Sequence, residues 1–353
     1  MNPKPLNLKK MNKKKIAVII SLILVASVAI YGYINVFSSN TKFDKNELYV
    51  FIPTGSTYED VLKIVEPNVK DINKFKFVAE KRSYNSNVFP GRFLFKKGMS
   101  SFQMITALRH NEPLNLAFNN QESLEKLVSR LSSQMEVDST TLINSLRDTV
   151  FMKKNGFNNE TILGMFIPNT YQVKWNISAE KFREKMAKEY TAFWNSDRLA
   201  KAKALGMTSQ QVITLASIVH KETVKGDERP RVAGVYLNRL KLEMPLQADP
   251  TVIFAVKKES GDFDQVIKRV RGEMLHSSSP YNTYVHTGLP PGPIAMPDIS
   301  AIDAVLNAEK HDYIFFCASV ERFGYHDFAK TYEEHQVYAK KYAEWVTKLG
   351  IEK

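Results

Sequence analysis

One carboxylate of this chain occupies a position suited to proton transfer. Residues 208–223, TSQQVITLASIVHKET, begin with a Thr-x-x-Gln capping box, which predicts the start of a helix. Glu222 lies four residues after Ile218 and three after Val219, so it shares the inward, apolar face of that helix. Burial and the negative end of the helix dipole both raise the pKa of a carboxyl group placed there. Such a group suits general acid and base catalysis near neutral pH.

An alternative for Glu222 stays open at this level. A glutamate at the end of a helix can be exposed to solvent, or it can pair with an arginine. Arg229, just before the next predicted helix, and Arg239, within that helix, could serve as that partner. Helical spacing alone does not separate this structural role from a catalytic one.

Polar and aromatic residues after Glu222 could complete a site for a ligand that is rich in hydroxyl groups. Tyrosine rings offer flat apolar faces to sugars, and amide side chains both donate and accept hydrogen bonds. We expect the following substrate-binding side chains to converge with Glu222: Arg239, Gln247, Asp249, Thr251, Asn282 and Tyr284. Asp249 could instead cap a helix at Pro250, and the tyrosines could belong to the core.

Several other chemistries are excluded because their motifs are missing. The HKE sequence ending at Glu222 matches half of a zinc deaminase motif, but the chain has a single cysteine, Cys317. There is no H-E-x-x-H, no G-x-S-x-G and no glycine-rich nucleotide loop. The other histidines are scattered, and we expect His326 and His335 to be surface or structural residues. We therefore expect no metal site and no cofactor.

The positive charge of the chain is concentrated before an apolar segment. Six lysines within residues 1–15 account for half of the net charge of +12, so the remainder is only mildly basic and no nucleic-acid partner is expected. Residues 16–37 contain 22 consecutive uncharged residues, enough to span a bilayer as a helix. The lysines predict that residues 1–15 form a cytoplasmic tail and that the chain from residue 38 onward is exported.

A cleaved signal peptide is the alternative for the apolar segment, because small residues occur at positions 26–29. The length of the segment and the nearby Tyr31 and Tyr33 favour a retained, single-pass anchor in the cytoplasmic (inner) membrane. Under either interpretation, most of the chain works outside the cytoplasm.

The exported part is predicted to contain two units. A chain of 353 residues is too long for one core of ordinary size. Residues 45–113 contain a strand–turn–helix pattern twice, with helix caps at Thr57 and Ser100. Residues 114–353 are helix-rich with a few strand-like runs, which predicts a larger α+β domain.

Within the larger domain the pattern predicts both regular elements and one irregular loop. Helices are expected over residues 121–135, 139–149, 179–194, 208–223, 230–242 and 331–349, and strands over 114–118 and 313–318. Residues 276–298 contain five prolines and two glycines, which is incompatible with regular structure. Long loops inside compact domains are usually functional or disordered, and the YNTY sequence argues against disorder here.

The larger domain contains, in order, the segments LASIVHKET, ERPRVAGVYLNRL, LQADPTVIFAV, SPYNTYVHTGLPPGPIAMP and HDFAKTYEEH. Taken together, these five segments closely resemble the YceG-like family of endolytic murein transglycosylases. The resemblance covers roughly residues 115–350, and residues 45–113 resemble, more weakly, the LysM-like module that these proteins carry. FIPNTY resembles the family's F-P-D-T-Y segment, with Asn169 where aspartate is usual. The family's E-K-E-T segment holds its catalytic acid; here His220 takes the first position, and Glu222 is the remaining carboxylate.

The resemblance implies cleavage of the β-1,4 bond between N-acetylmuramic acid and N-acetylglucosamine within peptidoglycan strands. Glu222 would protonate the glycosidic oxygen and then take the proton of the muramoyl 6-hydroxyl, which closes a 1,6-anhydro ring. The expected role is termination or trimming of nascent glycan strands, with peptidoglycan synthases or division proteins as expected partners. One alternative is a hydrolytic muramidase with Asp227, Glu228 or Asp249 as the second carboxylate. Another is a membrane-tethered peptidoglycan-binding protein without turnover.

Overall fold

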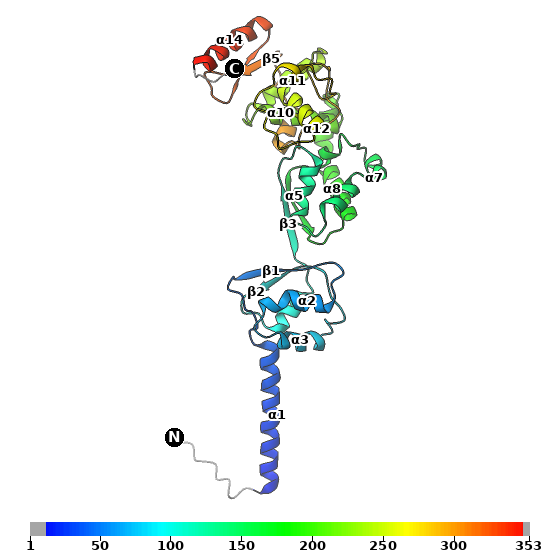
Figure 1. Cartoon of the computed structure of the whole chain (residues 1–353), viewed down its shortest axis with the longest axis vertical. Helices are drawn as coiled ribbons and strands as arrows, with labels where there is room; N and C mark the ends of the chain where they lie inside the picture. The colour runs from blue at the N-terminus through cyan, green and yellow to red at the C-terminus, as the bar shows by residue number, and fades with distance from the viewer. Residues whose placement is uncertain (1–11, 349–353) are drawn as a thin grey trace. The chain divides into compact units, whose positions relative to one another are not determined.

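The computed structural model describes residues 12–348 and combines helices with short strands, which confirms the predicted α+β class (Figure 1). Its internal contacts divide the chain into two compact units. The first contains the chain up to residue 114 together with residues 172–176. The second contains residues 115–171 and the chain from residue 177 onward.

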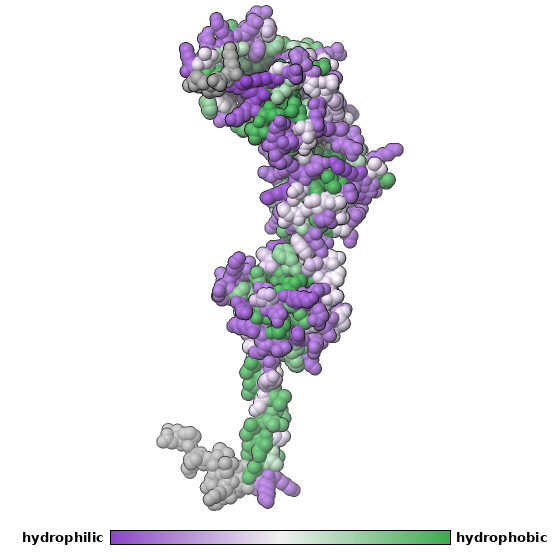
Figure 2. All heavy atoms as spheres, viewed as in Figure 1, coloured by the Kyte–Doolittle hydropathy of each residue, from purple (hydrophilic) through white to green (hydrophobic). Residues whose placement is uncertain are grey.

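The apolar segment near the N-terminus forms helix α1 (Lys13–Phe37), which is long and apolar enough to cross a membrane. Asn12 begins the helix, because its side chain accepts a hydrogen bond from the backbone N–H of Lys14. None of its residues is buried, and Figure 2 shows hydrophobic side chains along most of its length. A signal sequence has the same properties, so both predicted interpretations stay open. Residues 1–11 of the predicted basic tail lie outside the described residues.

The first unit contains the predicted pair of strand–turn–helix segments. Its strands and capped helices are β1 (Glu47–Ile52), α2 (Tyr58–Val65), β2 (Gly91–Lys96) and α4 (Ser101–Ala107). The strands pair antiparallel, with Glu47 opposite Lys96. Thr57 and Ser100 form the capping boxes expected from the sequence. The two segments therefore form one small αβ fold, and its similarity to a LysM module stays a prediction.

One helix of the first unit is not predicted by the sequence pattern. Helix α3 (Ile72–Lys81) follows a short 3-10 turn (Glu66–Asn68) and begins at Asp71, whose side chain accepts hydrogen bonds from two backbone N–H groups. Lysines interrupt its apolar residues, so the helical period is weak in the sequence. Phe75 and Val78 are nevertheless buried in the core that the two strands share with α2 and α4.

The second unit begins with short strands and helices. They are β3 (Pro113–Phe118), α5 (Leu124–Ser132), α6 (Ser139–Leu146), α7 (Thr149–Lys154), a 3-10 turn (Ile162–Met165), β4 (Asn169–Lys174), α8 (Ala179–Phe193) and α9 (Ser196–Ala204). Strands β3 and β4 pair with each other. The boundary between the two units crosses both strands, after residue 114 in β3 and after residue 171 in β4. The single helix predicted over residues 139–149 is wrong, because the Asp148 side chain caps a new helix, α7.

Helix α10 (Ser209–Glu222) lies at the centre of the second unit. Every residue from 212 to 219 is buried, because α10 packs against α11 (Arg229–Lys241), α12 (Asp249–Ser260) and α13 (Ile299–Leu306). Its apolar face is thus wider than the single stripe that the sequence predicts. The helix ends at Glu222, where the backbone turns to an extended conformation.

The predicted proline-rich loop is irregular and ordered. A 3-10 turn (Gly272–His276) precedes it, and no helix or strand is assigned between residues 277 and 298. Tyr281 and Ile294 are buried, and the Ile294 N–H donates a hydrogen bond to the Ser217 hydroxyl of α10 at 3.0 Å. The loop is therefore part of the core around α10.

The described C-terminal part consists of a hairpin and a helix. Strands β5 (Phe315–Ala318) and β6 (His326–Ala329) pair antiparallel, and α14 (Tyr332–Lys348) packs against both. The Thr331 hydroxyl accepts a hydrogen bond from the Glu334 N–H, and the helix begins at residue 332, close to the predicted start at residue 331. Residue 349, the last residue of the helix predicted here, lies outside the described residues.

Candidate active site

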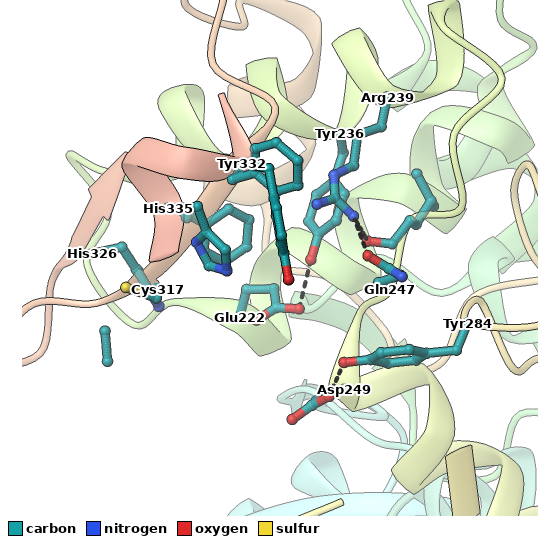
Figure 3. A pocket seen from close by; sticks show the side chains of 14 residues that line it. Glu222, Tyr236, Arg239, Gln247, Asp249, Tyr284, Cys317, His326, Tyr332 and His335 are labelled. Atoms are coloured by element: carbon teal, nitrogen blue, oxygen red, sulfur yellow. Dashed lines mark hydrogen bonds between the residues drawn. The ribbon is translucent and has the colours of Figure 1, made fainter. Parts of the chain in front are cut away.

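A cavity of about 330 Å³ in the second unit has Glu222 in its wall. Side chains from α10, α11, the 246–249 segment, the proline-rich loop, the β5–β6 hairpin and α14 surround it (Figure 3). The residues that line it are Glu222, Tyr236, Arg239, Leu246, Gln247, Asp249, Tyr284, Phe315, Phe316, Cys317, Ala318, His326, Tyr332 and His335. Elements more than 100 residues apart in sequence thus meet at one carboxylate.

The environment of Glu222 makes it a good proton donor near neutral pH. The side chain is half-buried, and its Oε1 accepts a hydrogen bond from the Tyr236 hydroxyl at 2.6 Å. Burial raises the pKa of Glu222 to about 7, although the Tyr236 hydrogen bond opposes this shift. Between residues 12 and 348, neither Arg229 nor Arg239 forms an ion pair with Glu222. The alternative of a glutamate paired with an arginine is therefore not observed.

Tyr236 is held in its protonated form beside the carboxylate. It lies on α11 and is fully buried. Its ring packs edge-on against the Phe316 ring, with the two ring centroids 5.8 Å apart. Burial, followed by the neighbouring charge of Glu222, keeps the pKa of Tyr236 well above its usual value. The Tyr236 hydroxyl therefore keeps the proton that it donates to the Glu222 carboxylate.

Arg239 lines the cavity, one helical turn beyond Tyr236, but most of its donors bind the backbone. Its guanidinium donates to the carbonyl oxygens of Ile314, Pro245 and Leu246 at 2.6, 3.1 and 3.0 Å. It also donates to the Gln247 side chain at 3.2 Å. Arg239 therefore ties the start of the hairpin to the 245–247 segment and supports the cavity from one side.

Four of the six predicted binding residues lie at the cavity. Besides Arg239 these are Gln247, Asp249 and Tyr284, and the Tyr284 hydroxyl donates a hydrogen bond to Asp249 at 2.6 Å. In Figure 3 the Asp249–Tyr284 pair and the two histidines flank Glu222 from different walls. Asp249 is the first residue of α12 and its side chain makes no helix cap, so the capping alternative is wrong.

Thr251 and Asn282 do not reach the cavity, in contrast to the prediction. The Thr251 hydroxyl is within 2.8 Å of the Thr283 hydroxyl and donates to the Ala248 carbonyl. Asn282 is buried and donates to the carbonyls of Leu275 and Ser277. Their polar groups are satisfied inside the protein, so they hold the two segments that present Gln247, Asp249 and Tyr284.

The hairpin and α14 supply residues that the sequence does not assign to the site. His326, Tyr332 and His335 all line the cavity, and His326 is hydrogen-bonded by Glu228 as well. His326 is hydrogen-bonded to Glu228, as expected of a structural histidine, but the position of both histidines at the cavity is not predicted by the sequence. Tyr332 and His335 lie three residues apart on one helix face, which is a possible signal, but the sequence does not show which face meets Glu222.

The three carboxylates considered as partners for Glu222 lie in different surroundings. Asp227 is exposed and accepts a hydrogen bond from Tyr325. Glu228 is buried, and its oxygens bind His326. Of the three, Asp249 lines the cavity together with Glu222.

Two further features bear on the chemistry of this site. His220, half-buried on α10, does not line the cavity; its Nδ1 lies 3.3 Å from an Asp298 oxygen, and burial lowers its pKa. Within the described residues, no group of three histidine, cysteine or acidic side chains could hold a metal ion.

A model of the YceG-like family matches residues 50–341. The chain belongs to the YceG-like family.

Relatives with assigned names share most of the length of this YceG-like chain. A protein of Bacillus subtilis named endolytic murein transglycosylase is 27% identical over 340 residues, which cover 91% of each chain. A protein of the same name from Streptococcus pneumoniae is 26% identical and aligns with 91% of this chain and 63% of its own. A crystal structure of a yceG-like protein from Listeria monocytogenes, 26% identical, covers 83% of this chain and 99% of its own with a TM-score of 0.55.

The five segments that resemble the YceG-like family all contribute to the cavity. In sequence order, they supply Glu222, then Tyr236 and Arg239, then Gln247 and Asp249, then Tyr284, and finally His326, Tyr332 and His335. The fold therefore assembles the parts of the sequence that carry the resemblance around one ionisable group.

Proposed function

We propose that this YceG-like protein is an endolytic murein transglycosylase. The observation that carries the proposal is Glu222, a half-buried carboxyl group with its pKa raised to about 7 in the wall of an open cavity. The names of the relatives from Bacillus subtilis and Streptococcus pneumoniae support the same activity. The proposed substrate is the glycan strand of peptidoglycan.

The proposed reaction needs one group that gives a proton and later recovers one. Protonated Glu222 donates to the glycosidic oxygen between N-acetylmuramic acid and N-acetylglucosamine as that C–O bond breaks. The muramoyl 6-hydroxyl attacks the anomeric carbon, and its proton returns the Glu222 carboxylate to the acid form. The product ends in 1,6-anhydro-N-acetylmuramic acid, and no water is consumed. A carboxyl group that titrates near pH 7 is suited to both halves of this exchange.

The cavity offers contacts that suit an aminosugar. The amide of Gln247 and the Asp249–Tyr284 pair provide donors and acceptors for hydroxyl and acetamido groups. The aromatic rings of Phe315 and Tyr332 offer apolar faces in the same cavity. We propose that Gln247, Asp249 and Tyr284 bind substrate and that Arg239 holds the Gln247 side chain in place.

A hydrolytic muramidase is the second candidate, and Asp249 is the observation that favours it. A hydrolase needs another carboxylate near the acid, and Asp249 lines the same cavity as Glu222. The Tyr284 hydroxyl already donates to Asp249, which supports a binding role for this carboxylate over activation of water.

We further propose that α1 anchors the protein in the cytoplasmic membrane with its N-terminus inside. The lysines that precede the apolar run of α1 support this orientation, and it would expose the second unit to nascent glycan strands. The first unit would act as a LysM-like module between the anchor and the catalytic unit. Termination or trimming of new strands, next to peptidoglycan synthases or division proteins, is the proposed role.

The mass of the product separates the two enzymatic candidates. Incubation of the full-length protein in detergent with purified peptidoglycan should release fragments with anhydro ends, which are one water lighter than hydrolytic fragments. Because no metal is needed, EDTA should leave the product pattern unchanged. Mass spectrometry of the soluble fragments is the measurement. Fragments with only reducing ends would identify a muramidase, and no fragments at all would favour a binding protein without turnover.

Replacing Tyr236 with phenylalanine should move the alkaline loss of activity to higher pH. The change removes a hydrogen bond that favours the ionised carboxylate, so the pKa of Glu222 rises. The active, protonated form of Glu222 therefore persists to higher pH. A hydrogen bond to a charged group contributes about 1.5–3 kcal/mol, which corresponds to about one to two pH units. The measurement is the rate of anhydro-product release against pH. Tyr325→Phe removes a similar hydrogen bond to the exposed Asp227 and should not move the profile.

A further inference from the structure

A buried carboxylate orients one histidine of the cavity. The side chain of Glu228 is 3% exposed and accepts two hydrogen bonds from His326, one from the backbone N–H at 2.7 Å and one from Nδ1 at 2.9 Å. Although burial raises the pKa of Glu228, these hydrogen bonds lower it overall, so the carboxylate is ionised. An ionised carboxylate only accepts, so Nδ1 of His326 carries the proton.

The other ring nitrogen of His326 is free to act on a ligand. His326 lines the same cavity as Glu222, and its Nε2 has no hydrogen-bond partner among residues 12–348. The Phe316 ring packs edge-on against the His326 imidazole, with the ring centroids 5.0 Å apart, and so fixes the plane of the imidazole. A carboxylate that binds Nδ1 and leaves Nε2 as the acceptor is the arrangement by which proteins orient a histidine base.

The other charged and titratable groups around His326 do not provide the same function. The cavity elements that face it carry Glu222, Tyr236, Arg239, Asp249, Tyr284, Cys317, Tyr332 and His335, and the preceding residues place Asp227 and Tyr325 nearby. Burial raises the pKa of the Cys317 thiol to about 11, so this thiol is neutral. His335 stacks on Phe315, its Nδ1 is buried without a partner in the described residues, and burial lowers its pKa.

We propose that His326, oriented by Glu228, is a second proton-transfer residue of the site and accepts the proton of the attacking sugar hydroxyl. The inference rests on the proposed function and refines its second half. Glu222 remains the acid, and His326 Nε2 becomes the first acceptor of the hydroxyl proton.

The proposed step balances in protons and bonds. The glycosidic C–O bond breaks while the Glu222 proton moves to the leaving oxygen. The 6-hydroxyl oxygen forms the new bond to the anomeric carbon while its proton moves to Nε2 of His326. The site is then left with a Glu222 carboxylate and a His326 imidazolium. Transfer of one proton from the imidazolium to the carboxylate, through water in the open cavity, restores both groups.

Two proton-transfer groups and one group predict different pH profiles. If Glu222 alone acts as acid and base, activity falls only at alkaline pH, where its proton is lost. If neutral His326 is also needed, activity falls at acidic pH as well, because the imidazolium cannot accept a proton. We call this loss of activity at acidic pH the acidic limb of the profile. Its presence or absence therefore reports on the need for His326.

The test compares the initial rates of anhydro-product release by four full-length proteins between about pH 5 and pH 9. Relative to wild type, His326→Gln should lower the rate at the optimum by about 10²-fold or more and lack the acidic limb. Glu228→Gln should lower the rate at the optimum by about 10-fold or more, because a glutamine side chain no longer fixes the proton on Nδ1 of His326. His335→Gln, the matched change on the other cavity histidine, should keep the limb where it is.

Thermal unfolding of each variant shows whether its fold is intact. If His326→Gln does not fold, the rate of Glu228→Gln at the optimum decides, and a wild-type rate would overturn the inference. A wild-type profile without an acidic limb, or a His326→Gln variant that keeps both limb and rate, overturns the inference while anhydro products still support the proposed function. Absence of anhydro products from the wild type would instead overturn the proposed function itself.

Discussion

Glu222→Gln is expected to reduce anhydro-product release by about 10³-fold or more, because the amide has no proton to donate to the leaving oxygen. Glutamine has nearly the same size as glutamate, and its carbonyl oxygen can still accept the Tyr236 hydrogen bond. The cavity should therefore keep its shape. The measurement is the initial rate of fragment release from purified peptidoglycan, together with the mass of the fragments.

Glu344→Gln is the matched control, because this glutamate is exposed on α14 and does not line the cavity. It should retain the wild-type rate. If Glu222→Gln releases the same fragments as wild type, Glu222 is not the acid. Asp249→Asn would then test the carboxylate that shares the cavity.

Arg239→Met is expected to destabilise the second unit by about 2–4 kcal/mol, because three backbone carbonyls lose their donor at once. Methionine keeps much of the apolar stem, so the lost hydrogen bonds dominate over a packing defect. The hairpin that carries His326 and the segment that carries Gln247 both lose an attachment. The measurement is the urea concentration at the midpoint of unfolding, with circular dichroism as the signal.

Lys241→Met, on an exposed position of the same helix, is the control and should leave the urea midpoint unchanged. Arg239→Met should also lower activity at temperatures where the protein remains folded. An unfolding midpoint equal to that of wild type would show that the carbonyls of Pro245, Leu246 and Ile314 do not depend on Arg239.

The two predictions separate the chemistry of the site from its support. Glu222 is expected to affect the rate with little effect on stability, whereas Arg239 is expected to affect stability first. Thr251 and Asn282 belong with Arg239 in this respect, because their polar groups bind other parts of the protein. We therefore expect the polar residues of the site to comprise side chains that act on substrate and side chains that hold these in place.

Features that depend on residues close together in sequence were predictable from the sequence. The capping boxes at Thr57, Ser100 and Thr208 mark helix starts that the structure confirms, because each box is made within four residues. The position of Glu222 on an apolar face follows from the helical period. The length of α1 follows from an uninterrupted apolar run.

Features that depend on the meeting of distant segments required the tertiary structure. Nothing near His326 in the sequence indicates that Glu228, 98 residues earlier, binds it. The side chains of Thr251 and Asn282 resemble those of ligand-binding residues, and only their burial shows that their hydrogen bonds are already made. Local sequence thus predicted helix α10 and the place of Glu222 on its apolar face, whereas packing of α11, the hairpin and α14 around α10 decided which polar groups face the cavity. The physical reason is that a polar side chain is available to a ligand only if the folded chain leaves it without an internal partner.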